Sequence, residues 1–257
     1  MSINFAEFLY FDTHCHLNYE PIYGKKDIIT SAKDNKVLIN CVGVNIDTCY
    51  KSLDIAKAHS DQVIASLGFH PESIDELDKI DELDKLIGDN LDIVKAIGEC
   101  GLDYHYQPLD KEKQKELFVK QIELAIKYKL PLIIHCRDAY QDLYDILKQH
   151  YKDLTKILIH CYDGTKEWVE KFNEVDVYYA IGGKITYPAA EYLREAIKYI
   201  PKNRLVLETD APWLSPIPFR KEINTPSNVK ITLQYIKNIL GREIEQEIYQ
   251  NSLALFF

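Results

Sequence analysis

The feature of this sequence that most constrains its fold is a series of eight short apolar runs, most of them rich in β-branched residues. Most of these runs lack an alternation of polar and apolar residues, as is typical of parallel strands that are buried on both faces. Helical patterns separate them, such as the apolar stripe that contains Phe118, Ile122 and Ala125. The eight runs are Leu9–His14, Val37–Gly43, Val63–His70, Val94–Glu99, Leu132–His135, Ile157–His160, Val177–Ile181 and Leu205–Asp210.

The alternation of strand and helix patterns predicts an α/β fold with a parallel sheet. Eight such units in 257 residues predict closure into a (β/α)₈ barrel, with residues 1–257 forming one domain. Two segments, Glu99–Lys111 and Asp210–Asn228, are longer than the usual connections in such folds. Long connections in a compact domain tend to carry function, so we expect both segments to lie at the functional site.

The charge of the chain argues against one class of function. The formal net charge is -9 and no run of Lys or Arg is present, whereas a protein that holds DNA through its surface charge is usually basic. An acidic protein can still act on a phosphodiester if bound metal ions supply the positive charge locally.

No segment of the sequence predicts a membrane protein or a secreted protein. The stretch Met1–Phe11 lacks the basic residues and the apolar run of a signal peptide. Nowhere do about 18 apolar residues follow one another, as a transmembrane helix requires. We therefore expect a cytoplasmic protein with no membrane partner.

The six cysteines form no CxxC pair and no spacing typical of disulfides. Cys15, Cys100, Cys136 and Cys161 each directly follow a residue that can bind a metal. Successive side chains of a strand point to opposite faces, so these thiols should point toward the surrounding helices when their neighbours point toward the barrel axis. Buried, inert cysteines are expected, and metal binding by a thiolate is the weaker alternative.

Five of the eight runs end in residues that can bind a metal. Active sites of (β/α)₈ barrels lie at the carboxyl ends of the strands, so these side chains should converge. His14 and His16, two positions apart, project from the same strand face and can bind one ion together. The other candidate ligands are Glu99, His135, His160 and Asp210.

Each of these residues has an ordinary structural explanation when it is taken alone. A histidine at a strand end is often a hydrogen-bonded residue of the core, and Glu99 or Asp210 could cap a helix or pair with an arginine. Together, however, four histidines and two carboxylates would form a repulsive cluster without cations. Six donors also exceed the three or four that one catalytic zinc uses, which predicts two ions with a shared carboxylate.

Several longer motifs resemble those of the TatD family of metal-dependent deoxyribonucleases, within the amidohydrolase-like barrel superfamily. The resemblance runs from Phe11 to the C-terminus, and the ordered set of motifs is more specific than a single HxH. The motifs are FDTHCHLN (Phe11–Asn18), GFHPE (Gly68–Glu72), AIGECGLDY (Ala96–Tyr104), LPLIIHCRDA (Leu130–Ala139), HCYDGT (His160–Thr165) and LVLETDAPWLSP (Leu205–Pro216).

The resemblance implies a binuclear site and a hydrolase that removes nucleotides from the 3′ end of DNA, with endonuclease activity as the open alternative. Mg, Mn and Zn are the candidate ions: four imidazoles favour the softer metals, whereas members of the family are generally described as Mg-dependent. The implied ligands are His14, His16 and Asp210 for the first ion, His135 and His160 for the second, and Glu99 as the bridge.

Two segments depart from the family pattern. Residues 220–226 read RKEINTP where the family commonly has a sequence like RGKRNEP, and His70-Pro71 is followed by Glu72 instead of His. Neither change affects a ligand, so both bear on the substrate and not on hydrolysis.

The same motifs suggest catalytic roles. Asp210 is expected to accept the proton of the attacking water, and Glu99 to act in catalysis as the bridging ligand. Glu208 lies two positions before Asp210, so it should also point inward and orient a ligand or its water. Arg137, two positions after His135, could hold a phosphate oxygen, or it could pair with a barrel carboxylate.

Further candidates are residues that could contact the substrate. His70 and Tyr104 are expected to do so, and Trp213 could stack on a base, with ordinary packing as the alternative for Trp213. DNA is the expected partner, and no obligate protein partner is evident.

Two other functions remain open. One is hydrolysis of another ester or amide, such as a cyclic amide or an aminoacyl-tRNA ester, because this fold supports many chemistries. The other is a barrel without catalytic activity that binds a partner. The complete ligand set argues against a barrel without activity.

Overall fold

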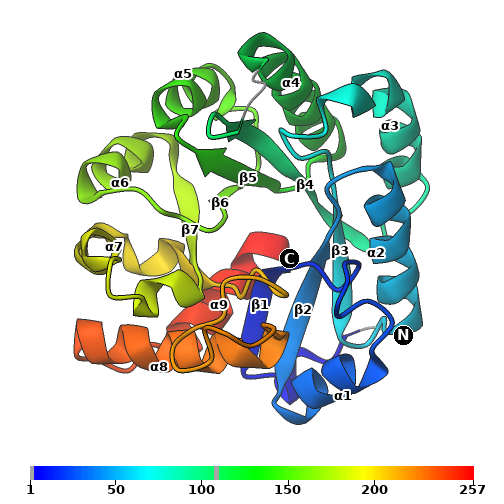
Figure 1. Ribbon diagram of the computed structural model, residues 1–257. Coiled ribbons are helices and arrows are strands. Elements are labelled where there is room, and N and C mark those ends of the chain that lie inside the picture. The colour runs from blue at the N-terminus through cyan, green and yellow to red at the C-terminus, as the bar shows by residue number, and fades with distance from the viewer. Residues whose placement is uncertain (1–2, 107–109) are drawn as a thin grey trace.

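A computed structural model of the protein describes residues 3–106 and 110–257. Across these residues, eight parallel strands form one sheet in which each strand pairs with the next along the chain, and helices surround it (Figure 1). The strands are β1 (Tyr10–Cys15), β2 (Val37–Val42), β3 (Val63–Leu67), β4 (Val94–Asp103), β5 (Leu132–Arg137), β6 (Ile157–Ile159), β7 (Val177–Ile181) and β8 (Leu205–Leu207). The predicted (β/α)₈ barrel is confirmed.

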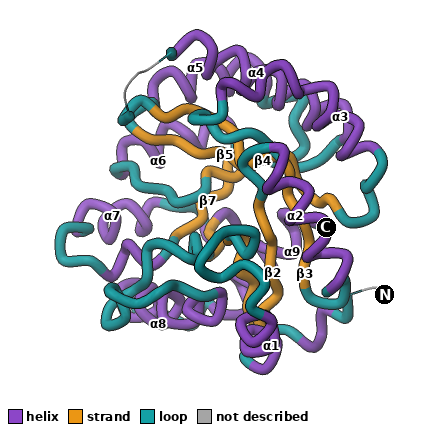
Figure 2. The backbone as a smooth tube through the Cα atoms, turned by 45° about the vertical axis from the view of Figure 1, so that its right-hand side comes forward, coloured by secondary structure: helices purple, strands orange, loops and turns teal. Residues whose placement is uncertain are grey.

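Most of the helices lie around the outside of the ring of strands, as the rotated view in Figure 2 also shows, whereas the last helix lies across one end of the barrel. This arrangement buries both faces of the sheet, which explains the uninterrupted apolar runs of the strands. The α-helices are α1 (Lys26–Asp34), α2 (Ile46–Ala58), α3 (Ile80–Gly88), α4 (Lys111–Tyr128), α5 (Tyr140–His150), α6 (Lys166–Phe172), α7 (Glu191–Ala196), α8 (Val229–Leu240) and α9 (Glu245–Phe256).

Several strands differ from their predicted bounds near the site, among them β4 and β8. Strand β4 continues to Asp103, beyond the predicted end at Glu99, and β8 stops at Leu207, before the predicted end at Asp210. The longer β4 takes up Glu99–Asp103, the first part of the segment that the sequence suggested as a long loop, of which residues 107–109 lie outside the described part. The catalytic candidates after β8 therefore sit on a connection and not on a strand.

The barrel closes between β8 and β1 through a set of specific hydrogen bonds. The carboxylate of Asp12 accepts from the backbone N–H of Thr209 at 2.8 Å and from its hydroxyl at 2.6 Å. The Thr13 hydroxyl donates to the carbonyl of Leu207. The backbone N–H of Asp210 donates to the carbonyl of His14 at 3.0 Å. These bonds hold the end of β8 against β1, which brings Asp210 beside the HxH motif.

The interior of the barrel is filled by apolar side chains at its amino-terminal end. Phe11, Leu38 and Ile133 belong to a buried cluster that also includes Leu255 and Phe256 of α9. The ring centroids of Phe11 and Phe256 are 5.1 Å apart. Helix α9 thus closes the end of the barrel opposite to the metal ligands and leaves the carboxyl ends of the strands open.

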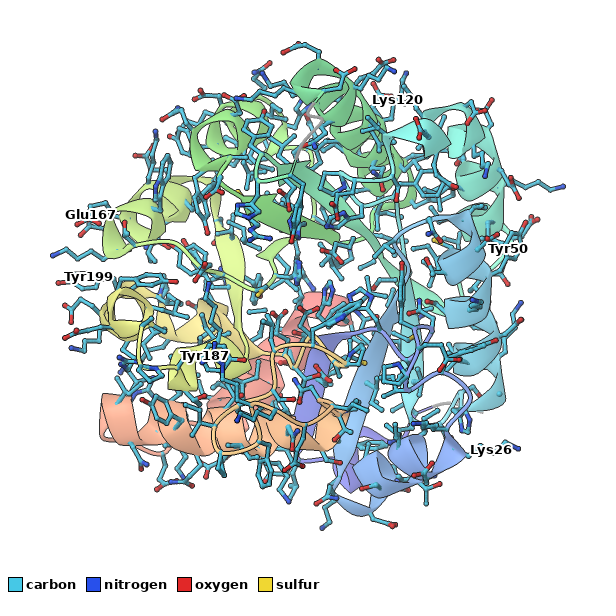
Figure 3. All side chains as sticks on the ribbon, viewed as in Figure 1. Lys26, Tyr50, Lys120, Glu167, Tyr187 and Tyr199 are labelled. Atoms are coloured by element: carbon cyan, nitrogen blue, oxygen red, sulfur yellow. The ribbon has the colours of Figure 1, made fainter. Side chains whose placement is uncertain are left out.

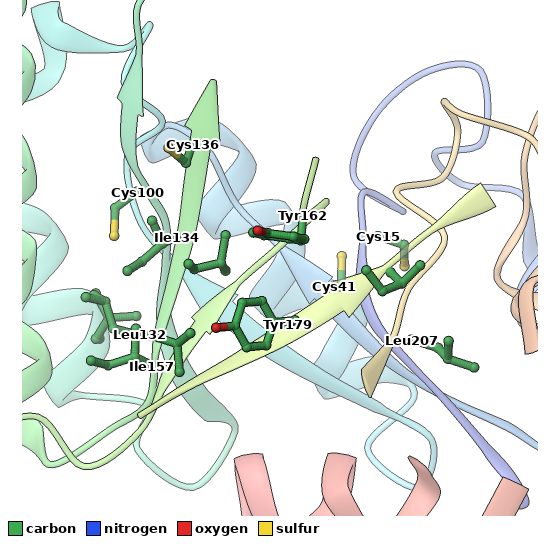
Figure 4. Close-up of a cluster of buried hydrophobic side chains, with 14 of the residues drawn as sticks. Cys15, Cys41, Cys100, Leu132, Ile134, Cys136, Ile157, Tyr162, Tyr179 and Leu207 are labelled. Atoms are coloured by element: carbon green, nitrogen blue, oxygen red, sulfur yellow. The ribbon is translucent and has the colours of Figure 1, made fainter. Parts of the chain in front are cut away.

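A second core cluster lies between the strands and the helices and contains several of the cysteines (Figure 4). Cys15 and Cys100 are fully buried there, where burial raises the pKa of both thiols well above the usual range. Cys136 also belongs to this cluster and is buried, as expected, although it borders the cavity at the mouth of the barrel as well. Cys161 is less buried and borders the same cavity, so the expectation of a buried thiol that points away from the barrel axis does not hold for it. For Cys161 the cause is that β6 ends at Ile159, so strand alternation no longer applies.

Within the described residues, no helix is long and apolar enough to cross a membrane.

Candidate metal centre

All six predicted ligands meet at the carboxyl ends of the strands. They come from β1 and β8, which meet where the barrel closes, and from β4, β5 and β6 on the opposite side of the barrel. The six are His14 in β1, His16 just after it, Glu99 in β4, His135 in β5, His160 directly after β6 and Asp210 on the connection after β8. The structure thus brings together residues that are up to 196 positions apart (210 − 14).

Glu99 lies at the centre of this cluster and its two carboxylate oxygens face different partners. Oε2 lies 3.2 Å from His14 Nε2 and 3.6 Å from His16 Nε2. Oε1 lies 3.0 Å from His135 Nδ1 and 2.7 Å from His160 Nε2. Glu99 therefore stands between two pairs of imidazoles, the arrangement that a carboxylate bridging two ions requires.

The glycines on either side of Glu99 explain how the strand presents this side chain. The pairing of β4 with β5 shifts register between Ile97 and Cys100, so Glu99 lies in an irregular part of the strand. Gly98 and Gly101 both have φ of +135°, a conformation that other residues rarely adopt. A Cβ atom at Gly101 would lie 2.1 Å from the carbonyl oxygen of His135. The backbone around the central carboxylate therefore requires glycine at both ends of the GECG motif.

The donor atoms form three groups that could each hold an ion. In each group the nitrogen and oxygen atoms lie within 4.8 Å of one another. One group consists of His14, His16 and Asp210, in agreement with the expected first site, and His16 Nε2 lies 3.4 Å from Asp210 Oδ1. The other two groups are His14 with Glu99 and His160, and His70 with Glu99 and His135.

The electrostatics of the cluster favour positive charge. Burial lowers the pKa of His16, His135 and His160, but the surrounding carboxylates outweigh it, so each pKa lies above its usual value. Burial raises the pKa of Glu99 and Asp210, yet the nearby imidazoles keep both below their usual values. Burial and neighbouring imidazoles act in the opposite direction on two other rings, and they lower the pKa of His14 to about 4 and that of His70 to about 3. The donors fit hard-to-borderline divalent ions such as Mg, Mn or Zn.

Some of the imidazoles have a polar partner at the nitrogen that faces away from Glu99, whereas His14 Nδ1 has no hydrogen bond. His16 Nδ1 donates to the carbonyl of Val42 at 3.0 Å. His160 Nδ1 lies 3.6 Å from Glu208 Oε2. Such outer contacts fix which ring nitrogen is free to bind a metal.

Glu208 is fully buried and points inward, as its spacing from Asp210 suggested. Its Oε1 accepts from the backbone N–H of Cys161 at 2.7 Å, which directs the other oxygen toward His160. Burial raises the pKa of Glu208 above its usual value, although its contacts with His160 oppose this rise. The geometry supports the predicted role of orienting a ligand.

Asp103 has a similar position and was not recognised from the sequence. Its Oδ2 accepts from His135 Nε2 at 2.8 Å, which leaves Nδ1 of that ring facing Glu99. The Asp103 side chain is 1% exposed, and Gln114 hydrogen-bonds both its backbone N–H and its carbonyl. Alternation along β4 places residues 99, 101 and 103 on the same face, but this signal was lost when the strand was ended at Glu99.

We expect Asp103→Asn to lower the pKa of His135 in the metal-free protein, because the carboxylate that stabilises the charged imidazole is removed. An NMR titration of the histidine ring protons measures this change. Asp138→Asn is the matched control, since the exposed Asp138 contacts His105 and should leave His135 unchanged. An unaltered pKa of His135 in Asp103→Asn would contradict the orienting role of Asp103.

The cluster opens into a cavity of about 1280 Å³. Its wall includes His70, predicted to contact the substrate, whose Nε2 lies 3.6 Å from Glu99 Oε1, close enough for a ligand role as well. Arg137 also lines the cavity. Its Nη1 donates to the hydroxyl of Tyr106 at 3.0 Å, and its guanidinium carbon lies 5.0 Å from the centre of that ring.

Tyr104 is not brought into the cavity, contrary to the sequence prediction. Its hydroxyl donates to Asp142 of α5 at 2.7 Å, and Lys111 lies over its ring. Along the strand direction Tyr104 points to the helix layer, whereas Asp103 faces the barrel axis. The tyrosine of this connection that borders the cavity is Tyr106, whereas Tyr104 does not border it.

Comparison with known proteins agrees with this geometry. The family model of TatD-related DNases matches residues 11–257. The chain belongs to the TatD family. A metal-dependent hydrolase of Bacillus subtilis, described as uncharacterized, is 36% identical over 255 residues, covering 96% of this chain and 98% of that relative. A similarly described hydrolase of Mycoplasma genitalium is 34% identical over 260 residues, covering 96% and 99%.

Solved TatD structures have the same fold. The crystal structure of YjjV, a TatD homolog from Escherichia coli, superposes with a TM-score of 0.90 at 28% identity and covers 96% of this chain and 98% of that chain. A TatD-family hydrolase from Entamoeba histolytica gives a TM-score of 0.86 at 25% identity, covering 96% and 98%. The family predicted from the motifs is confirmed, and the protein is a metal-dependent hydrolase.

Proposed function

We propose that this protein is a deoxyribonuclease that removes nucleotides from the 3′ end of DNA at a centre of two divalent ions. The observation that carries the proposal is the position of Glu99 between two groups of imidazoles in an open cavity. The name of the matching family model supports DNA as the substrate class.

His14, His16 and Asp210 would hold one ion, His135 and His160 the other, and Glu99 would bridge them. When bound, two such ions supply a lowered pKa for an attacking water and positive charge for the phosphoryl oxygens. The fit of the site to these ions rests on its donor set and on the raised pKa values of three of its imidazoles.

Asp210 is the residue that accepts the proton of the attacking water. Its pKa is kept below the usual value because the hydrogen bond with His16 outweighs the effect of burial, so it is a carboxylate at neutral pH. Its side chain is 14% exposed and borders the cavity, so a water in the cavity can reach it. Proton acceptance requires such contact with the nucleophile.

Three basic side chains on the cavity wall would bind phosphate groups of the substrate. They are Arg137 of β5, Lys184 on the segment after β7, and Arg220 on the connection after β8. Arg220 lies 4.3 Å from the ring centre of Tyr187, which Figure 3 places inside the ring of helices, well away from the periphery. Local cations of this kind compensate for the negative net charge of the chain.

A different ester or amide substrate is the second candidate, and one observation favours it. Glu72, Asp138 and Asp163 also border the cavity. Asp163 pairs with Lys184, but the other two carboxylates would repel a long polyanion. A compact substrate, such as a cyclic amide, would meet less repulsion, whereas an aminoacyl-tRNA ester would bring a polyanion of its own.

We expect single-stranded DNA labelled at its 5′ end to be shortened stepwise from the 3′ end when Mg, Mn or Zn is present, and EDTA to stop the reaction. The salt dependence should be moderate, because few basic residues displace counterions. A gel time course with a parallel panel of esters and amides measures both candidates. Hydrolysis in the panel without any shortening of DNA would replace the nuclease proposal by the second candidate.

A further inference from the structure

Trp213 is exposed directly beside the candidate metal centre. The residue is 46% exposed, and like Tyr19 it borders the cavity. The Trp213 ring centroid lies 5.2 Å from that of His16 and 5.5 Å from that of Tyr19. We call Tyr19 and Trp213 the aromatic wall.

The backbone that carries Trp213 is firmly held, although its ring is exposed. The Trp213 N–H donates to the carbonyl of Asp210 at 2.9 Å, and its carbonyl accepts from Asn224 Nδ2 at 2.7 Å. Asn224 is fully buried and also donates to the carbonyl of Thr209 at 2.8 Å. A large apolar ring that only completed the core would be covered, as Trp usually is. The backbone that carries this ring is instead held in place, and the ring borders the cavity in a residue that is 46% exposed.

The cavity wall therefore combines two kinds of recognition. The aromatic wall adjoins His16 and Asp210, the candidate ligands of the first ion, whereas Arg137 and Lys184 come from β5 and the segment after β7. A substrate suited to both would carry a planar ring next to an anionic group. Aromatic side chains bind nucleobases by stacking, regardless of the base, and basic side chains bind the backbone phosphates.

We infer that the aromatic wall is a stacking subsite for the nucleobase adjacent to the phosphodiester that is cleaved, with Trp213 as its main contact. This inference rests on the proposed function for the position of the phosphate, but the binding of a base can be measured without catalysis. The subsite would not distinguish one base from another, because stacking does not read hydrogen-bonding edges.

Fluorescence tests the subsite in the absence of cleavage. The chain has two tryptophans, so Trp168→Phe leaves Trp213 as the only one. Trp168 packs against Tyr140 of α5 at a centroid distance of 5.4 Å, away from the aromatic wall. In EDTA, dAMP should quench the fluorescence of Trp168→Phe in a saturable manner, whereas deoxyribose 5-phosphate, which lacks the base, should not. Equal quenching by both compounds, or by neither, would overturn the inference.

Steady-state kinetics provide a second test of the stacking subsite. For single-stranded DNA with an ordinary 3′-terminal nucleotide, Trp213→Ala should raise KM by about 5- to 150-fold, the range for one stacked base. Trp213→Phe should restore most of the loss, and Trp168→Phe should behave as the unaltered protein. With a terminal tetrahydrofuran residue in place of the nucleoside, Trp213→Ala should have no effect. Unchanged KM on both substrates would also overturn the inference.

The outcomes separate this inference from the proposed function. Quenching by dAMP without any cleavage of DNA would support the subsite and contradict the nuclease. Cleavage of DNA without quenching, and with a normal KM for Trp213→Ala, would support the nuclease and contradict the subsite.

Discussion

Asp210→Asn should abolish turnover while leaving the fold and most of the metal binding intact. The asparagine keeps the shape of the side chain and one oxygen that can bind a metal, but it cannot accept a proton from the attacking water. The backbone N–H of residue 210 still donates to the carbonyl of His14, so the seam between β8 and β1 is preserved. Loss of general-base assistance alone lowers the rate by about 10²- to 10⁴-fold, and weaker ligation should add to the loss.

Steady-state rates and metal content, both measured for Asp210→Asn and Glu208→Gln, test this expectation. Glu208 is the matched control because it is buried next to the same ligands but contacts His160 and the backbone of Cys161 instead of the cavity. Glu208→Gln should reduce the rate less than Asp210→Asn. A nearly normal rate for Asp210→Asn with both ions bound would exclude Asp210 as the proton acceptor and point to another group on the cavity wall, such as His70.

The convergence of the six ligands could be predicted from the sequence because barrel geometry is regular. Once eight strands are recognised, residues at the strand ends must lie at one mouth, whatever their distance along the chain. His14 and His16 followed from strand alternation alone. Glu99 as the central carboxylate was suggested by the family motif, and its position depends on a register shift that the motif signals only through its glycines.

The residues that orient the ligands or line the cavity were harder to predict. Asp103 was missed because the end of β4 was placed too early, and a strand boundary is decided by pairing with β5, which a single sequence does not reveal. Tyr104 was expected to contact the substrate as a loop or strand-end residue, but it follows directly on β4 and its hydroxyl bonds to Asp142 of α5. The exposure of Trp213 depends on the buried amide of Asn224, eleven positions away (224 − 213), a tertiary contact without a local pattern.

Glu99→Gln should weaken both ion sites together, whereas His160→Ala should mainly empty the second. In the unaltered protein the two oxygens of Glu99 lie within 3.2 Å of His14 Nε2 on one side and 2.7 Å of His160 Nε2 on the other. Glutamine removes the negative charge and one of the two oxygens, so neither group of imidazoles keeps its carboxylate partner. Alanine at position 160 removes one donor and leaves His14, His16 and Asp210 in place.

Elemental analysis of metal-loaded protein distinguishes these outcomes, with about two ions per chain expected before mutation, about one for His160→Ala and less than one for Glu99→Gln. Because His16, His135 and His160 have raised pKa values without metal, ion binding must displace protons, and retention of both ions should fall as the pH is lowered. A reproducible limit of one ion per chain in the unaltered protein would contradict the binuclear centre. Retention of one ion by Glu99→Gln, equal to that of His160→Ala, would show that Glu99 serves one site and does not bridge two.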